Sequence, residues 1–408
     1  MFHVKQSSGC RFTPGLLLRQ LGVCYHPAVK LRRALPAGVL ALCSILLLAA
    51  CGPTADPEGW AAPVFDGDTV YVFLDDDHLS AVQLDDNSGV ILWTFPDDNL
   101  TSEEEVELKG VYTEPIVDGD FIYFGAYDGE VYAVGRADGR LRWTTEGQLN
   151  IKGSIVGGPV LVDASLIFGT TDGHVYRVQA SDGAPFPGWP QAGISLSKKG
   201  IWAPPVVQGG TVYVATMAGE VHALELATAN QVWAEPFEGD RGAIADLASL
   251  DGAGPLFVPT LGRHVYLLDP ATGQSVGAGA AATHWVWTRP AVSGSVAYYG
   301  DFAGELFAID ITNATIAWTA ATDGRVKGGP AVVGDYVVFV DESPAVIFVN
   351  RESGEVRNRV ALQDAGRIRA GATARDGIAY VVSTNGKLFR ADPGNFSVSE
   401  IPIAGLNE

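Results

Sequence analysis

The sequence predicts an all-β protein, an eight-bladed β-propeller of four-stranded antiparallel blades. The first observation is a succession of short apolar runs that are separated by turns, and Asp-Gly between apolar runs is a strong hairpin signal. The second is that this pattern returns about every 42 to 46 residues, which is typical of a repeat architecture. Helical repeats of similar length need a 3.6-residue periodicity, which these segments lack.

The segment Glu114–Trp143 is the clearest copy of the repeat. Turns at Asp118-Gly119, Asp128-Gly129 and Asp138-Gly139 divide it into short apolar strands. The strands expected are Ile116–Val117, Phe121–Phe124, Val131–Val134 and Leu141–Thr144. One such sheet cannot bury both of its faces, so each copy needs neighbours.

A glycine in the central hairpin marks the other copies. These glycines are Gly129, Gly173, Gly219, Gly262, Gly304 and Gly386, and a degenerate copy lies near Pro344. An earlier copy spans Pro63 to Trp93. Eight units result, running from about Trp60 to Ala404, and they predict one ring at residues 60–408.

Residues 1–50 are predicted to be a signal peptide and not part of the ring. Basic residues precede the apolar run Ala34–Ala50, which is short for a membrane span. Leu48-Ala49-Ala50-Cys51-Gly52 resembles the lipobox of bacterial lipoproteins, which implies cleavage before Cys51 and lipidation of that residue. Residues 51–59 then form a tether. The alternatives are an uncleaved signal anchor and, for residues 1–28, translation that starts at Val29.

Charge and cysteine content limit the chemistry of the processed chain. Of the four cysteines only Cys51 would remain, so no disulfide is expected. Six of the 27 basic residues and none of the 47 acidic ones lie before Cys51, which leaves a net charge of −26. This charge disfavours nucleic acid and anionic lipid as partners. The membrane is expected to be contacted only through the lipid.

A tryptophan motif carries a family resemblance. Ala133, Gly139 and Trp143 follow the A-x-D-x-x-x-G-x-x-x-W spacing of the tryptophan-docking repeats in pyrroloquinoline-quinone (PQQ) propellers, and Ala308-to-Trp318 and Ala223-to-Trp233 are similar. Looser copies end at Trp93 and Trp189, whereas Gly277 stands at the tryptophan position of blade five. Blades seven and eight lack the tryptophan. The expected docking residues are Trp93, Trp143, Trp189, Trp233 and Trp318, and their role is blade packing.

The resemblance implies several functions. Quinone-dependent dehydrogenases of this family bind the quinone with calcium and a catalytic aspartate, and no residue here matches that aspartate or the calcium ligands. The propeller lipoprotein of the outer-membrane β-barrel assembly machinery resembles this chain in its lipid anchor and its short blades. We therefore expect a monomeric, extracytoplasmic, non-enzymatic lipoprotein without cofactor that binds envelope proteins or a membrane complex. The alternative is a PQQ-dependent oxidoreductase or a binder of small anions at the channel mouth.

Other motifs give little evidence of catalysis or metal binding. Asp75-Asp76-Asp77 and Asp85-Asp86-Asn87 lack the EF-hand spacing, and turn aspartates often bond their own backbone. No Ser-His-Asp order, His-Glu-x-x-His or phosphate loop stands out. The pair Asp301 and Glu305 cannot be given acid–base roles without geometry. No catalytic residue and no metal ligand is therefore predicted.

Basic residues beside small ones recur ahead of the innermost strands. They are Lys109, Lys152, Lys199, Lys327 and Arg369. The link between successive blades passes the channel mouth on the face that also carries the central hairpins. We expect these five cations to ring that mouth and to attract an anionic ligand or an acidic partner segment, with the opposite face the more acidic one. The alternative is that they are solvated and only offset nearby Asp-Gly turns.

Overall fold

The computed structural model describes residues 59–74, 78–85, 87–97, 106, 108–239, 242–250 and 252–405. All of them belong to one compact unit, Asp56–Glu408. The predicted signal peptide, Cys51 and most of the tether lie outside the described residues. Across the described ranges the secondary structure is β-strand, and no helix there is long and apolar enough to span a membrane.

Eight four-stranded antiparallel sheets follow one another along the chain, which confirms the predicted fold class. Blade 1 contains β1 (Val64–Asp66), β2 (Thr69–Phe73), β3 (Leu79–Leu84) and β4 (Gly89–Phe95), and blade 2 contains β5 (Ile116–Asp118), β6 (Phe121–Gly125), β7 (Val131–Gly135) and β8 (Leu141–Thr144). Blade 3 contains β9 (Val160–Val162), β10 (Ser165–Gly169), β11 (His174–Gln179) and β12 (Ile194–Ser195), and blade 4 contains β13 (Val206–Gln208), β14 (Thr211–Ala215), β15 (Glu220–Glu225) and β16 (Phe237–Glu238).

The second half of the ring repeats this order. Blade 5 contains β17 (Ala248–Ser249), β18 (Leu256–Pro259), β19 (His264–Leu268) and β20 (Ala280–Ala281), and blade 6 contains β21 (Ala291–Ser293), β22 (Val296–Gly300), β23 (Glu305–Asp310) and β24 (Thr315–Ala321). Blade 7 contains β25 (Ala331–Val333), β26 (Tyr336–Asp341), β27 (Ala345–Asn350) and β28 (Val356–Ala361), and blade 8 contains β29 (Thr373–Arg375), β30 (Ile378–Val382), β31 (Leu388–Asp392) and β32 (Ser397–Ile401).

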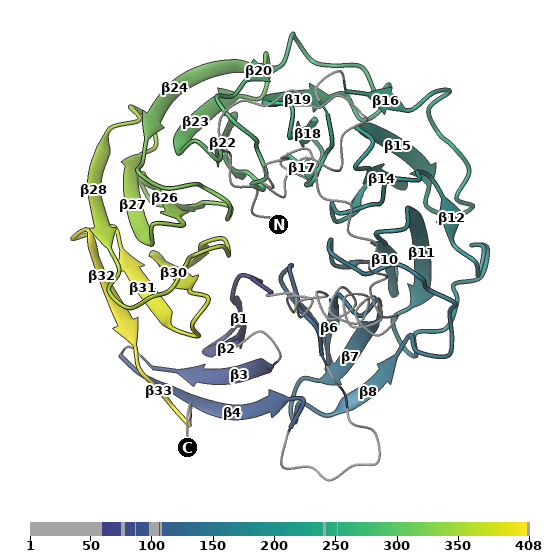
Figure 1. The fold of residues 1–408 in the computed structure, drawn as a ribbon, viewed down its shortest axis with the longest axis horizontal. Helices are drawn as coiled ribbons and strands as arrows, with labels where there is room; N and C mark the ends of the chain where they lie inside the picture. Colours follow the sequence, from purple (N-terminus) through teal and green to yellow (C-terminus); the bar gives the residue numbers. More distant parts are fainter. Residues whose placement is uncertain are drawn as a thin grey trace, which may run out of the picture. The chain divides into compact units, whose positions relative to one another are not determined.

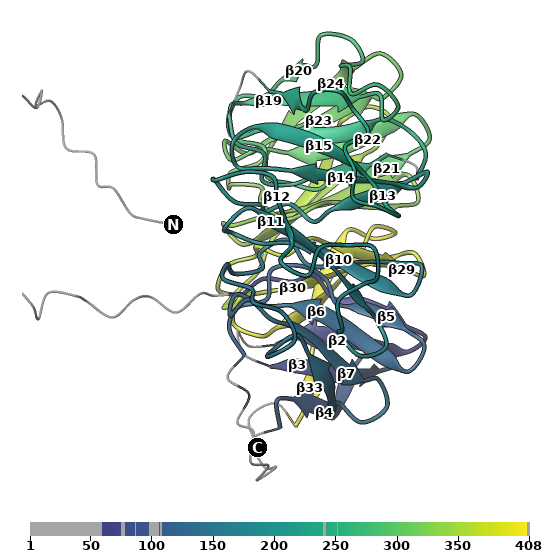
Figure 2. The ribbon, with the colours of Figure 1, turned by 90° about the vertical axis from the view of Figure 1, so that its right-hand side faces the viewer.

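The blades form a closed ring around a central channel, with the first strand of each blade innermost (Figure 1; Figure 2, side view). A fifth strand, β33 (Ile403–Ala404), closes the ring by pairing in parallel with β4 of blade 1. This strand lies within the predicted range of the blades, about Trp60 to Ala404, and it leaves blade 8 to complete the first blade.

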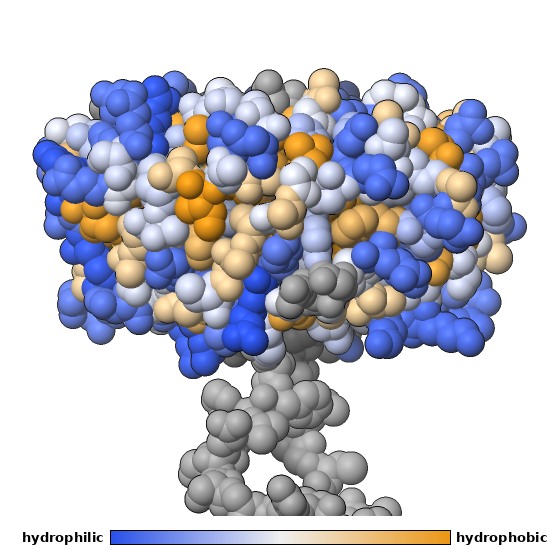
Figure 3. All heavy atoms as spheres, turned by 90° about the horizontal axis from the view of Figure 1, so that it is seen from above, coloured by the Kyte–Doolittle hydropathy of each residue, from blue (hydrophilic) through white to orange (hydrophobic). Residues whose placement is uncertain are grey.

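The hydrophobic core is divided among the blade interfaces. The described residues form eight apolar clusters, and each cluster joins side chains of two adjacent blades. Tyr71 and Phe73 of blade 1, for example, pack with Ile122 and Phe124 of blade 2. The outer wall is mixed, with apolar residues over its middle and hydrophilic ones towards the rims (Figure 3). Each blade therefore buries both faces only because it has two neighbours.

Tryptophans join the outer parts of neighbouring blades. The indole N–H of Trp143 donates a 3.1 Å hydrogen bond to the carbonyl of Ala180 in blade 3. Trp93, Trp189, Trp233 and Trp318 donate in the same way to carbonyls of the following blade, at Arg136, Leu226, Pro270 and Arg351. All five tryptophans predicted to dock therefore lie across a blade interface, and their polar N–H group is satisfied there.

A close contact between blades explains the glycine in the tryptophan motif. A Cβ at Gly183 would lie 2.6 Å from the Trp143 ring, and one at Gly354 would lie 2.7 Å from Trp318. Both glycines also have positive φ, and the backbone of their turn packs directly against the face of the indole ring. Blade 7 has no tryptophan, and there Asn358 donates its side-chain N–H to the carbonyl of Phe396 in blade 8.

Blade 7 turns at Pro344 without a left-handed residue, but in blades 2 to 6 and 8 the hairpin between the second and third strands contains one. Gly129, Gly173, Gly219, Gly304 and Gly386 supply it, with φ between 76° and 96°. In blade 5 the left-handed residue is Arg263, at φ 66°, and Gly262 has no positive φ. The sequence reading aligned Gly262 with the other hairpin glycines, and it was one residue out of register, because a glycine is not obligatory at this site.

Candidate functional site at the channel mouth

The links between blades are anchored by one buried aliphatic residue each. These anchor residues are Val111, Ile155, Ile201, Ile244, Val286, Val326 and Ile368, and each is at most 1% exposed. The N–H of Ile155 donates to the carbonyl of Ala126 in the hairpin of the preceding blade, and the carbonyl of Ser154 accepts from Thr171 of the next blade. The links of Ile201, Ile244, Val286 and Val326 are bonded to the hairpins on both sides in the same way.

The residue after each anchor residue lines the channel. Together with Trp60 from the first link, these positions form a ring of eight side chains, one per blade. The channel ring consists of Trp60, Tyr112, Val156, Trp202, Ala245, Trp287, Lys327 and Arg369. Sequence reasoning selected Lys327 and Arg369 but missed the other six. The signal was available for five of these six, since each of the five follows an isolated Ile or Val in its link, whereas Trp60 follows Gly59.

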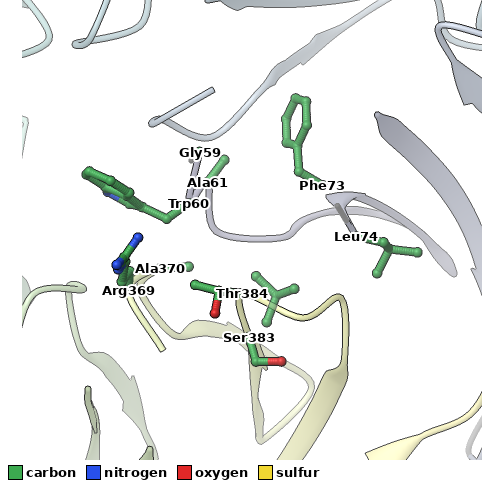
Figure 4. Close-up of a pocket in the computed structure, with 10 residues that line it drawn as sticks. Gly59, Trp60, Ala61, Phe73, Leu74, Arg369, Ala370, Ser383 and Thr384 are labelled. Carbon is green, nitrogen blue, oxygen red and sulfur yellow. The ribbon is translucent and has the colours of Figure 1, made fainter. Parts of the chain in front are cut away.

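The channel ring surrounds a cavity of about 570 Å³ that is partly open to solvent. The Lys327 ammonium lies 3.2 Å from the centre of the Trp60 ring and 5.6 Å from that of Trp287. The Arg369 guanidinium is 5.7 Å from the Trp60 ring, towards which it points in Figure 4. Trp202 and Trp287 are 5.8 Å apart, centroid to centroid. The cavity therefore combines aromatic faces with two cations, which favours cation–π attraction.

An ion pair lies deeper in the same cavity. Arg289 and Asp246 approach to 3.7 Å, and their side chains are 45% and 14% exposed. Desolvation raises the pKa of Asp246 to about 6, although the attraction of Arg289 opposes this shift, and Glu114 adds to it. The carboxyl therefore exchanges its proton with water near neutral pH.

The raised pKa of Asp246 predicts a pH-dependent stability. Ionisation of Asp246 costs more free energy in the folded chain than in the unfolded one. The contribution of the protonated carboxyl to the free energy of unfolding is therefore fully present below pH 4 and is lost as the pH rises through about 6. Asp246→Asn should remove this loss, and the free energy of unfolding of the native chain should fall relative to the variant between pH 4 and 7. Urea unfolding of both proteins across this pH range measures the difference in their free energies of unfolding. A difference that stays constant with pH would contradict the raised pKa of Asp246.

The five predicted cations lie on equivalent links but not at equivalent positions. Lys327 and Arg369 follow their anchor residues and line the cavity, where Lys327 is 9% exposed and Arg369 lies 3.5 Å from Glu342. Lys109, Lys152 and Lys199 precede their anchor residues and are exposed. The structure therefore brings two of the five together inside the channel and leaves three on the links outside it.

Histidines and acidic residues near the hairpins serve local structure. Asp301 is fully buried and accepts from the backbone N–H groups of Thr283 and His284. His222 lies 3.5 Å from Glu220, and burial lowers its pKa. Asp75–Asp77 lie outside the described residues, and Asp85 accepts from Asn87 and Ser88. Within the described ranges no group of three His, Cys, Asp or Glu side chains could hold a metal ion.

The opposite face of the ring carries the other two turns of each blade. Aspartates recur in these turns, at Asp66, Asp68, Asp85, Asp118, Asp120, Asp138, Asp163, Asp182, Asp269, Asp310, Asp335, Asp376 and Asp392. Several of them bond their own turn backbone, as Asp269 and Asp310 do. Aspartate is therefore a recurrent turn residue on the face away from the channel ring.

The rings of the channel do not form a parallel pair. Lys327 covers a face of Trp60 at 3.2 Å, and the planes of Trp202 and Trp287 are inclined by 53°. Trp202 and Trp287 are therefore not arranged to hold a flat quinone between them.

Comparison with known proteins points to one family. Residues 52–191 and 261–399 match the family model described as outer membrane protein assembly factor BamB. BamB of Xanthomonas campestris pv. campestris is 26% identical over 318 residues, which cover 75% of each chain. The serine/threonine-protein kinase AfsK of Streptomyces griseus is 26% identical over 171 residues, 39% of this chain and 20% of the kinase.

A solved structure has the same architecture. The crystal structure of BamB from Moraxella catarrhalis superposes with a TM-score of 0.62 at 17% identity, over 80% of this chain and 92% of that one. This likeness concerns the fold, whereas the family match covers most of the sequence. The chain belongs to the family of the outer membrane protein assembly factor BamB.

Proposed function

We propose that this protein is an extracytoplasmic, lipid-anchored scaffold that binds a membrane complex during outer-membrane protein assembly. The observation that carries the proposal is the family match, whose two segments include blades 1, 2, 6 and 7 and parts of blades 3, 5 and 8. The relative from Xanthomonas is named as an assembly factor and aligns over three quarters of its length.

The shape of the site supports a binding role. Eight links deliver side chains of different chemistry to one mouth. Hydrogen bonds to two hairpins fix five of these links, those of Ile155, Ile201, Ile244, Val286 and Val326. A rigid frame with variable side chains suits recognition, since little conformational entropy is lost on binding. We place the contact with the partner on this face.

Copurification tests the proposal. The tagged chain, expressed in its own host, should bring down subunits of the outer-membrane assembly complex after mild chemical cross-linking. Deleting its gene should lower the amount of folded barrel proteins in the outer membrane. The proposal is wrong if the tagged chain recovers no assembly subunit and the barrel proteins remain at normal levels.

Anchoring gives a separate prediction. Cys51→Ser should release the chain into the soluble fraction or leave its precursor uncleaved, because the lipid is the anchor that we propose after processing. Fractionation followed by mass spectrometry of the N-terminus measures both outcomes. Cys43→Ser is the matched control, since that residue lies in the segment to be removed. A cleaved, unlipidated form that stays on the membrane would contradict the assignment.

A further inference from the structure

We propose that the cavity inside the channel ring receives an aromatic side chain of a partner segment that carries carboxylates beside it. This inference rests on the proposed binding function and names the chemistry of the segment that enters. The partner is a protein chain that presents an exposed loop or terminus of this kind.

The apolar half of the cavity suits an aromatic side chain. Trp60 and Tyr112 meet edge to face with centroids 4.4 Å apart, and Trp202 and Trp287 stand 5.8 Å apart. The channel ring has small side chains at Val156 and Ala245, which leave room between the aromatic faces. A further aromatic ring can pack against these faces at an inclined angle.

The cationic half suits carboxylates. Lys327 and Arg369 come from the adjacent blades 7 and 8, so positive charge gathers on one arc of the channel ring. Glu342 lies 3.5 Å from Arg369, and the carboxylates of Glu114 and Asp246 line the cavity from other blades. Beyond the cavity, the exposed side chains of Lys109, Lys152 and Lys199 stand on the links of other blades. An acidic segment therefore meets complementary charge inside and outside the cavity, in a chain that is otherwise strongly acidic.

The extent of this surface points to a protein segment. Trp285 and Tyr127 are each 39% exposed, although most large apolar residues in the described part of the propeller are buried. The centroid of Trp285 lies 6.0 Å from that of Phe302, which stacks on Trp287 in the cavity, and Tyr127 lies 5.9 Å from Tyr112. Aromatic contacts thus continue from the cavity to the surface on two sides. Exposed aromatics and basic side chains around a pocket are typical of protein interfaces.

Labelled peptides test the chemistry. A short Gly-Ser peptide with a central Asp-Phe-Asp, its dye at the far end, should bind the intact chain in a fluorescence anisotropy titration. Peptides with Asn-Phe-Asn or Asp-Ala-Asp at the centre should each bind at least about fivefold more weakly. Binding of Asp-Phe-Asp should also weaken as salt rises. Equal binding of all three peptides, or no binding of any, overturns the proposal.

Variants test the location. Val156→Phe fills the cavity without changing charge, and Arg369→Gln removes one cation, so each should weaken binding of Asp-Phe-Asp at least about fivefold. Arg140→Gln is the matched control, because Arg140 is an exposed cation in a turn of the opposite face. Circular dichroism melting shows whether each variant folds. If Arg140→Gln weakens binding as much as Arg369→Gln, or Val156→Phe leaves it unchanged, the segment does not enter the cavity.

Two further measurements separate the outcomes. Phenylacetate should not displace the peptide at equal concentration, and full displacement would show a small-molecule site and overturn the peptide proposal. The full chain with Val156→Phe should recover less of the assembly complex than the native chain. Unchanged recovery by this variant would refute the inference and leave the proposed function standing, whereas failure of the native chain to recover the complex would refute that function.

Discussion

Trp143→Ala is expected to lower the free energy of unfolding by about 3 to 5 kcal/mol, the range for removing a large buried aromatic side chain. Trp143 is 9% exposed and packs with Tyr123 at a centroid distance of 5.9 Å. Its N–H group is bonded to Ala180 of the next blade, and its ring covers Gly183. The substitution leaves a cavity between two blades and an unsatisfied carbonyl, so both costs add.

Urea unfolding followed by circular dichroism measures this loss. Trp285→Ala is the matched control, since it removes the same side chain from an exposed position at the channel mouth, where the cost should be below about 1 kcal/mol. If both variants lose the same stability, Trp143 does not hold blades 2 and 3 together.

Gly173→Ala is expected to cost about 2 to 5 kcal/mol, although it adds only a methyl group. Gly173 has φ 87°, a conformation that costs an L-residue about 1 to 2 kcal/mol. Its added Cβ would also overlap the carbonyl oxygen of Ser197. Backbone cannot move aside as a side chain can, and overpacking of this kind typically costs a further 1 to 3 kcal/mol, roughly.

Gly377→Ala separates the two contributions to this cost. Gly377 has φ 78°, but no atom lies within 4 Å of its added Cβ. This variant should lose only about 1 to 2 kcal/mol, the cost of the backbone conformation. Urea unfolding of both variants isolates the steric part by difference. Equal losses would mean that the hairpin of blade 3 does not press against its outgoing link.

The repeat and its packing could be predicted from sequence because their signals are local. Each Asp-Gly turn sets a hairpin, and the Ala-to-Trp spacing of the motif places Ala133 opposite Trp143 in the sheet. The channel was harder to predict, since the register of a link depends on hydrogen bonds to two hairpins, from 17 residues away (Ser154 to Thr171) to 31 residues away (Ile201 to Thr170). Lys199 and Lys327 look alike in sequence, yet one precedes its anchor residue and the other follows it.

The closing strand could not be predicted for a different reason. Ile403 and Ala404 form a two-residue strand without turn residues or periodicity. Their partner, Gly89-Val90, lies in blade 1, far away in the sequence. Short apolar segments of this kind are ambiguous in sequence. The left-handed conformation of Arg263 was also missed, because the neighbouring Gly262 suggested that the left-handed residue lies one position earlier.

The pairing of β33 with β4 also determines when the protein can finish folding. Chains emerge from the ribosome N-terminus first, so blades 2 to 7 can pack on one another while blade 1 still lacks its fifth strand. Until residues 403–404 have been synthesised, the edge of β4 at Gly89 and Val90 exposes unpaired backbone groups, a known risk for aggregation. The first blade to be made is therefore the last to be completed, and a ribosome that stalls in blade 8 releases an open ring.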